Sequence, residues 1–147
     1  MSVTINYKKS ISARSLYNQI LFTDEKFNVS TLKKHLLSTE FSLITDLIKT
    51  KNLKKKIITF DISSKKKIIL VSIKKNISSS EVENLGAKFY DQFKDFKKAQ
   101  YNLNSDTISN LSKNIVGYFL HGIKLKSYKF DKYKSKKDKL NLLIIVS

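Results

Sequence analysis

The stretch Ile68-Ile-Leu-Val-Ser-Ile73 is apolar on nearly every successive residue. A strand with one solvated face alternates apolar and polar residues, so a continuous run of this kind indicates a strand covered on both faces. A second β-branched run, Ile57–Ile62, precedes it across the short polar segment Ser63–Lys67. These runs predict a sheet sandwiched between helices, with Ile68–Ile73 in a central position.

Short runs of β-forming residues predict four more strands. They are Val3–Tyr7, Gln19–Thr23, Ala99–Leu103 and Leu140–Val146. The first of them alternates apolar and polar residues, which is the pattern of a half-buried strand. Residues Lys8–Asn18, between the first two strands, are predicted to form a loop.

Helices are predicted where apolar residues recur every three or four positions, because that spacing places them on one face. The clearest stripe consists of Val82, Leu85, Phe89, Phe93 and Phe96. A second consists of Phe41, Ile44, Leu47 and Ile48. The longest helix has a third, formed by Ile108, Leu111, Ile115, Val116, Phe119 and Ile123. Burial of this helix is expected to weaken near Leu125, since Lys126 would fall in the middle of the stripe.

Residues suited to capping precede each helix, because their side-chain oxygens can accept hydrogen bonds from the free amides of a first turn. Ser30 is predicted to cap a short helix that ends between His35 and Leu37. The other predicted caps are Ser38 or Thr39, one of the serines at 78, 79 and 80, and Asp106.

The predicted order of elements is β-β-α-α-β-β-α-β-α-β. It indicates an α/β fold of the three-layer α-β-α type, around a mixed, mostly parallel central sheet. With 147 residues and 41% hydrophobic content, the chain suits one compact domain that spans residues 1–147.

The absence of cysteine removes disulfides, thiol nucleophiles and thiolate metal sites from consideration. No apolar run approaches the roughly 18 residues that a membrane helix needs, and the N-terminus lacks the basic start and apolar core of a signal peptide. A cytoplasmic protein without a membrane partner is therefore expected.

The formal net charge of +17 arises from 29 Lys plus Arg against 12 Asp plus Glu. Such a charge is compatible with an anionic partner such as nucleic acid. Arg14 is the only arginine, however, and recognition of bases and phosphates favours the planar guanidinium group. Compositional bias towards AT-rich codons, with solvated lysines, is the alternative explanation for the charge.

Candidate catalytic groups are few. His121 shares a helix face with polar residues and is expected to be a surface histidine; the other histidine is His35. Asp91 and Asp95 lie one turn apart, as a cation site would require, but nearby lysines favour ordinary ion pairs. No Gly-x-Ser-x-Gly elbow exists, so nucleophilic catalysis lacks support.

The three glycines, Gly86, Gly117 and Gly122, all fall inside predicted helices. A phosphate-cradling loop needs clustered glycines after a strand, so a dinucleotide or P-loop nucleotide site is disfavoured. Close packing of helices is the expected use, with Gly117 and Gly122 admitting a neighbouring element.

Aromatic residues alternate with lysines in the stretch Lys124–Lys137. The aromatic residues can anchor the end of the helix onto the domain or onto a partner; they are Tyr128, Phe130 and Tyr133. Alternatively, aromatics among lysines can stack bases and neutralise phosphates, which would make the chain a free-standing basic module that binds single-stranded nucleic acid. The lysines in contact would then be Lys126, Lys129, Lys132 and Lys134.

The segment Leu125–Lys137 closely resembles the segment Ser-Tyr-Arg-Phe-Asp-Arg-Tyr-Lys-Thr-Lys near the end of the N-terminal domain of cytosol (leucyl) aminopeptidases. Lys66–Lys75 is similar to the family's strand Val-Leu-Leu-Val-Gly-Leu-Gly-Lys, and the next helix carries Leu85-Gly-Ala87 at the matching distance. Ser72 and Lys74 replace the family's two strand glycines, so a close backbone approach at that point is not expected here.

The resemblance implies a macrodomain-like fold and a non-catalytic role for this chain. In that family a larger C-terminal domain binds two divalent metal ions, Zn or Mn, and releases N-terminal amino acids from peptides. Its ligand segment Asn-Thr-Asp-Ala-Glu-Gly-Arg-Leu is absent here, so no catalytic, cofactor-binding or metal-binding residue is carried over. The expected partners are the C-terminal domain of the same polypeptide and the other subunits of a hexamer, with a role in assembly and in access to the active sites. An ADP-ribose-binding macrodomain is disfavoured by the missing glycine loops.

Overall fold

A computed structural model of the chain describes residues 2–7, 18–51, 54–63, 66–93, 100–104, 114–131 and 141–146. Its centre is one six-stranded sheet with the order β1-β6-β5-β2-β4-β3. The strands are β1 (Ser2–Tyr7), β2 (Asn18–Thr23), β3 (Ile57–Asp61), β4 (Lys67–Ser72), β5 (Gln100–Leu103) and β6 (Asn141–Val146). All six predicted strands are therefore confirmed.

Neighbouring strands are parallel except for β3, which pairs antiparallel with β4. The chain between these two strands is too short for a crossover, and the backbone amides of Ile62 and Ser63 donate to the carbonyl oxygen of Lys66 to close the turn. This hairpin places β3 at the edge. Strand β4 has a strand on each side, so its predicted position inside the sheet is confirmed, although β5 and β2 lie nearer the middle.

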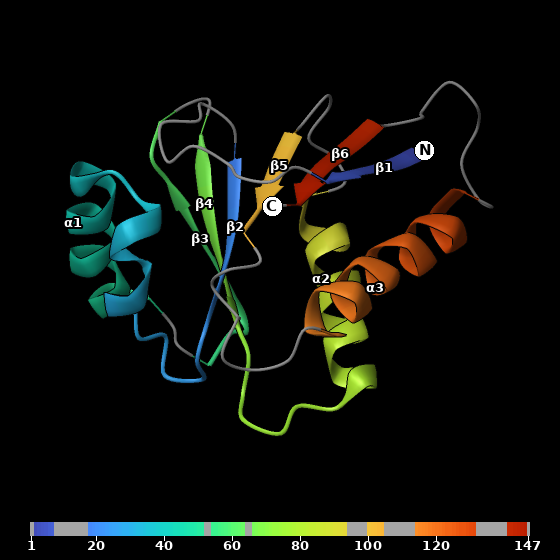
Figure 1. Ribbon diagram of the computed structural model, residues 1–147, viewed down its shortest axis with the longest axis horizontal. Helices are drawn as coiled ribbons and strands as arrows, with labels where there is room; N and C mark the ends of the chain where they lie inside the picture. Colours follow the sequence, from blue (N-terminus) through green and yellow to red (C-terminus); the bar gives the residue numbers. More distant parts are fainter. Residues whose placement is uncertain are drawn as a thin grey trace.

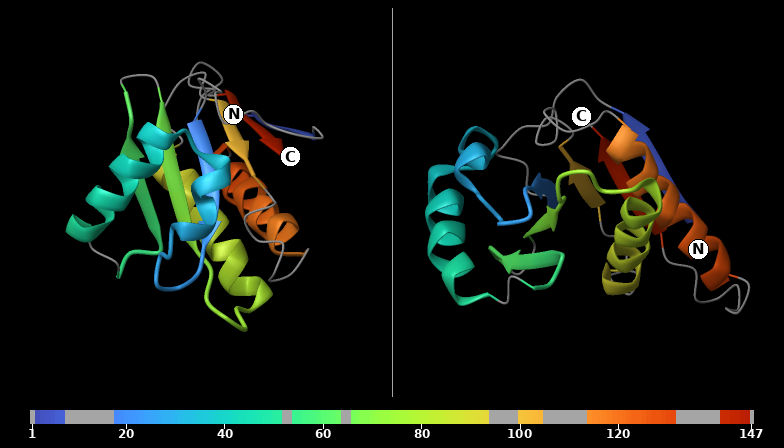
Figure 2. Two further views of the ribbon diagram at one scale, coloured as in Figure 1. Left: turned by 60° about the vertical axis from the view of Figure 1, so that its left-hand side comes forward. Right: turned by 90° about the horizontal axis from the view of Figure 1, so that it is seen from below.

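Helices cover both faces of the sheet, as predicted (Figure 1). Helix α1 (Ser38–Leu47) lies on one face with the 3-10 helices η1 (Ser30–His35) and η2 (Ile48–Thr50). Helices α2 (Ser79–Phe93) and α3 (Asn114–Asp131) lie side by side on the other face, as the two further views in Figure 2 also show. The predicted cap Asp106 and the apolar residues Ile108 and Leu111 lie outside the described residues.

The predicted helix caps have mixed outcomes. Ser78 caps α2: its hydroxyl accepts from the amide of Glu81 at 3.2 Å, while its own amide donates to that glutamate's carboxylate. Ser38 and Thr39 are not caps, because α1 begins after Leu37, whose amide donates to Oε1 of Glu40 at 3.2 Å. The Ser30 prediction is also wrong. Its hydroxyl donates to Oδ1 of Asn28 at 2.7 Å and makes no capping bond.

Two apolar clusters fill the spaces between the layers. Side chains of β4 alternate between them: Ile69 and Val71 face α2 and α3, whereas Ile68 and Leu70 face α1. This alternation confirms that the apolar run belongs to a strand covered on both faces.

Phe89 of α2 is the centre of an aromatic group that joins the layers. Its ring lies 4.9 Å from Phe93, 5.2 Å from Tyr101 of β5 and 5.7 Å from Phe119 of α3, measured between ring centroids. Each of these aromatic rings is buried, so the stripe predicted for α2 is confirmed as far as the structure describes it. Phe96 lies outside the described residues.

A buried ion pair joins the α1 layer to the sheet. Nζ of Lys66, just before β4, lies 2.6 Å from Oε2 of Glu40, and the two side chains are 8% and 4% exposed. The same carboxylate accepts from the amide of Leu37, so both of its oxygens are engaged. A buried pair of this kind tolerates loss of one partner poorly, because the remaining charge is left without compensation.

Two glycines allow α2 and α3 to come into backbone contact. A Cβ atom built on Gly86 would overlap the carbonyl oxygen of Phe119 and would lie 3.1 Å from the amide nitrogen of Ile123. One built on Gly122 would overlap the carbonyl of Glu83, with its carbon 2.7 Å away. Close helix packing was predicted for Gly122 and is confirmed. The same prediction for Gly117 is wrong, because a Cβ atom added there would meet no atom within 4 Å.

Gly122→Ala is expected to lower the free energy of unfolding by about 1–3 kcal/mol, because the added methyl group forces two helix backbones apart. Gly117→Ala in the same helix provides the matched control. It should raise stability by about 1 kcal/mol, since alanine is the better helix former and the position is open. Urea denaturation followed by circular dichroism measures both. Equal effects of the two substitutions would contradict this account of the contact.

Candidate functional site

The outward side of α3 carries exposed apolar side chains, among them Tyr128, which the sequence singled out. Tyr128 is 70% exposed, Leu125 43% and Tyr118 39%, which makes them three of the exposed large hydrophobic residues of the described chain. At about 100° per residue, positions 118, 125 and 128 fall within about 80° of arc on the helix. We call these three residues the α3 outer stripe. Tyr128 therefore does not anchor α3 to the described part of its own domain, and its role at an interface stays a prediction.

Of the lysines proposed to contact nucleic acid, only Lys126 has a described side chain. Its Nζ lies 3.5 Å from Oδ2 of Asp91 on α2, so part of its charge is compensated within the domain. Asp91 thus forms a surface ion pair, as expected, although with a lysine on the other helix. For Lys129 and Phe130 only the backbone is described, while Asp95, Lys132, Tyr133 and Lys134 lie outside the described residues.

The two histidines occupy different settings. His121 is an exposed residue, as predicted, and its Nδ1 lies 3.1 Å from Oε1 of Glu83, which ties α3 to α2. His35 is half-buried, with Nδ1 2.9 Å from the side-chain amide nitrogen of Asn104 after β5. Within the described ranges, no three His, Asp or Glu side chains gather closely enough to hold a metal ion.

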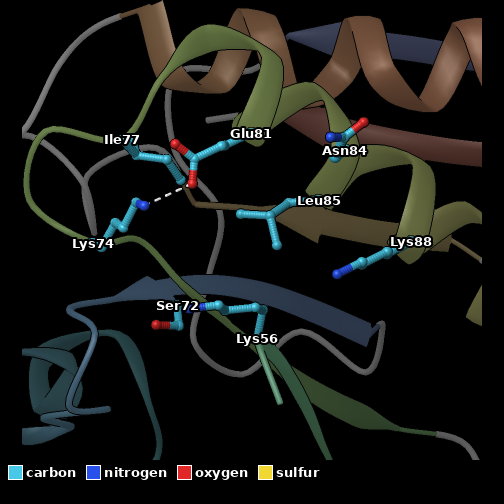
Figure 3. Close-up of a pocket in the computed structure, with 8 residues that line it drawn as sticks. All are labelled: Lys56, Ser72, Lys74, Ile77, Glu81, Asn84, Leu85 and Lys88. Carbon is cyan, nitrogen blue, oxygen red and sulfur yellow. Dashed lines mark ion pairs between the residues drawn. The ribbon is translucent and has the colours of Figure 1, made fainter. Parts of the chain in front are cut away.

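A cleft of about 150 Å³ opens beyond the carboxyl end of β4, between that strand and α2 (Figure 3). Its lining consists of Lys56, Ser72, Lys74, Ile77, Glu81, Asn84, Leu85 and Lys88. The carboxyl end of a parallel strand is the usual place for a ligand in an open α/β sheet. The replacement of two family glycines by Ser72 and Lys74 marked this point in the sequence. The lysines at 56 and 88 were missed, because the strand pairing and the helix position that bring them there are not visible in a linear pattern.

One carboxylate lies in this cleft, and its oxygens are both engaged. Oε2 of Glu81 lies 2.8 Å from Nζ of Lys74, and Oε1 accepts from the hydroxyl of Ser78 at 3.0 Å. The hydrogen bond from Lys74 is the main reason that the pKa of the Glu81 carboxyl lies below its ordinary value of 4.5, and Ser78 lowers it further.

No protein-family model matches the sequence, and no curated protein matches it. Among solved structures, the chain is similar to a mutant of tomato leucine aminopeptidase, with a TM-score of 0.69 and 17% sequence identity over 99% of this chain. The chain covers only 32% of that enzyme's chain. It is also similar to the macrodomain of Thermus aquaticus DarG, with a TM-score of 0.56 and 8% identity, covering 98% of this chain and 99% of that one. At these identities the comparisons show a shared macrodomain-like α/β fold.

None of the described helices combines the length and apolar character needed to cross a lipid bilayer.

We expect Lys74→Met to raise the pKa of the Glu81 carboxyl towards 4.5, because it removes the strongest stabilisation of the charged form. Since the folded-state pKa is depressed, the contribution of Glu81 to the first turn of α2 is present above 4.5 and is lost as the pH falls through the folded-state value. Side-chain NMR titration of Glu81 in the two proteins measures the change. An identical midpoint in both proteins would contradict the assignment.

Proposed function

We propose that residues 1–147 form the non-catalytic N-terminal domain of a metal-dependent leucyl aminopeptidase. The observation that carries the proposal is the similarity to tomato leucine aminopeptidase. It extends over nearly all of this chain but over only about one third of that enzyme. The TM-score is also higher for this enzyme than for the bacterial macrodomain. The sequence resemblance of Leu125–Lys137 supports the same assignment independently of the fold.

Under this proposal the chemistry belongs to a further domain, which would hold the two divalent metal ions, Zn or Mn, and release N-terminal amino acids from peptides. The present domain would contribute to assembly of a hexamer in the cytoplasm and to access to the active sites. The family's metal-ligand segment has no counterpart in this sequence, so no step of the hydrolysis is assigned to this chain.

The α3 outer stripe is the surface that we assign to the catalytic domain of the same polypeptide. Three residues are too few for an independent interface, which typically needs about 20–30 residues on each side. A tethered domain is present at millimolar effective concentration, so a small apolar contact can hold it in place. A second copy of this domain is a poorer occupant of this small stripe, because it is not tethered and lacks that effective concentration.

In a protein that joins this domain to the proposed catalytic domain, Leu125→Asp should lower stability by about 1–2 kcal/mol through loss of a buried apolar contact between domains. The same substitution in the 147-residue chain should have little effect, since Leu125 is exposed there. Leu43→Asp on α1 is the matched control, because Leu43 is 37% exposed on the opposite face of the sheet. Thermal unfolding of both proteins measures the difference. An equal loss in the 147-residue chain and in the two-domain protein would contradict the assignment of this surface.

A further inference from the structure

We propose that the cleft between β4 and α2 binds a small phosphate monoester. This site lies outside the proposed peptidase role, which assigns no ligand to this domain. The inference begins with charge: three lysines line the cleft against one glutamate, which gives a local balance of +3 − 1 = +2. A phosphate monoester carries a charge of about −1.5 to −2 at neutral pH, as phosphoserine does.

The three lysines are not equivalent. Lys74 is held by Glu81 at 2.8 Å, and the second oxygen of that carboxylate is occupied by Ser78. No ion pair within the described ranges engages Lys56 or Lys88. These two ammonium groups come from opposite walls, one before β3 and the other on α2 (Figure 3). An anion bound between them would therefore neutralise the positive charge that Glu81 does not compensate.

Hydrogen bonds of Ser72, at the end of β4, hold the wall of the cleft that carries Lys56 in place. The amide of Ser72 donates to the carbonyl oxygen of Lys56 at 2.8 Å, which fixes the backbone of Lys56 beside the end of β4. The hydroxyl of Ser72 donates to the carbonyl oxygen of Asp24 at 3.3 Å, and Ser72 is 3% exposed. Only the long lysine side chain is free to adjust. A preorganised backbone reduces the ordering cost of binding.

The other residues that line the cleft favour a phosphate ester over inorganic phosphate. Leu85 and Ile77 supply apolar surface, and Asn84 supplies an amide that can donate or accept. Figure 3 shows Leu85 between Lys74 and Lys88, so an apolar surface adjoins the proposed anion position. A cleft of about 150 Å³ is small, since sites for drug-sized ligands measure about 300–1,000 Å³, so a phosphate with a small organic group suits it better than a dinucleotide.

The test is a titration of the ¹⁵N-labelled 147-residue chain with phenyl phosphate and, separately, with inorganic phosphate, at constant ionic strength. Amide signals of Ser72, Lys74, Asn84 and Lys88 should shift together, with phenyl phosphate binding more tightly because its ring covers Leu85. Loss of one charge-assisted hydrogen bond should weaken binding about tenfold for each of Lys56→Gln and Lys88→Gln.

The double variant Lys33→Gln with Lys34→Gln is the matched control, since it removes charge of the same kind from exposed positions on η1 across the sheet. It should leave the affinity unchanged. Shifts spread over the lysine-rich surface, or equal losses in the cleft variants and the control, would overturn the site. If inorganic phosphate binds equally well or more tightly, the proposal that the ligand is an ester is wrong, and the cleft is a site for free phosphate. Circular dichroism of each variant confirms that these substitutions preserve the fold.

Discussion

The backbone contact between α2 and α3 at Gly86 and Gly122 is the constraint on which the other features depend. Each glycine faces a carbonyl group of the opposite helix, so neither helix can carry a side chain there. This contact sets the depth at which Phe89 and Phe119 enter the core. It also fixes which side of α3 faces outward and which side of α2 forms a wall of the cleft. Both candidate surfaces are thus consequences of one close helix approach.

Charge is distributed unevenly over this framework. Glu40 pairs with Lys66 and so links the α1 layer to the sheet, whereas Asp91 pairs with Lys126 and links the two helices of the other layer. Glu81 pairs with Lys74 in the segment before its own helix. Many lysines remain solvated, which explains how a chain of charge +17 can stay compact. The cleft differs from the rest of this surface because three lysines line one concave site together with the apolar side chains of Leu85 and Ile77. Geometry, more than total charge, makes it a candidate binding site.

The sequence predicted much of the fold because its apolar patterns are strong. The run Ile68–Ile73 and the stripe beginning at Val82 both indicated elements that the structure contains, and Ser78 fitted the capping pattern Ser-x-x-Glu. The wrong helix caps at Ser30, Ser38 and Thr39 are local errors, whereas the other failures arise from contacts distant along the chain. Linear spacing could not show that Gly86 rather than Gly117 meets a neighbouring backbone. For the same reason it could not place Lys56 opposite Lys88, so the cleft was only hinted at by the residues at positions 72 and 74.

The central claim is that this domain serves an enzyme whose catalytic residues lie elsewhere in the same polypeptide. Sequencing the gene beyond the codon for Ser147 tests it most directly. We predict that the reading frame continues into a segment resembling Asn-Thr-Asp-Ala-Glu-Gly-Arg-Leu, with the acidic residues of a two-metal site. A stop codon immediately after Ser147 would contradict the claim.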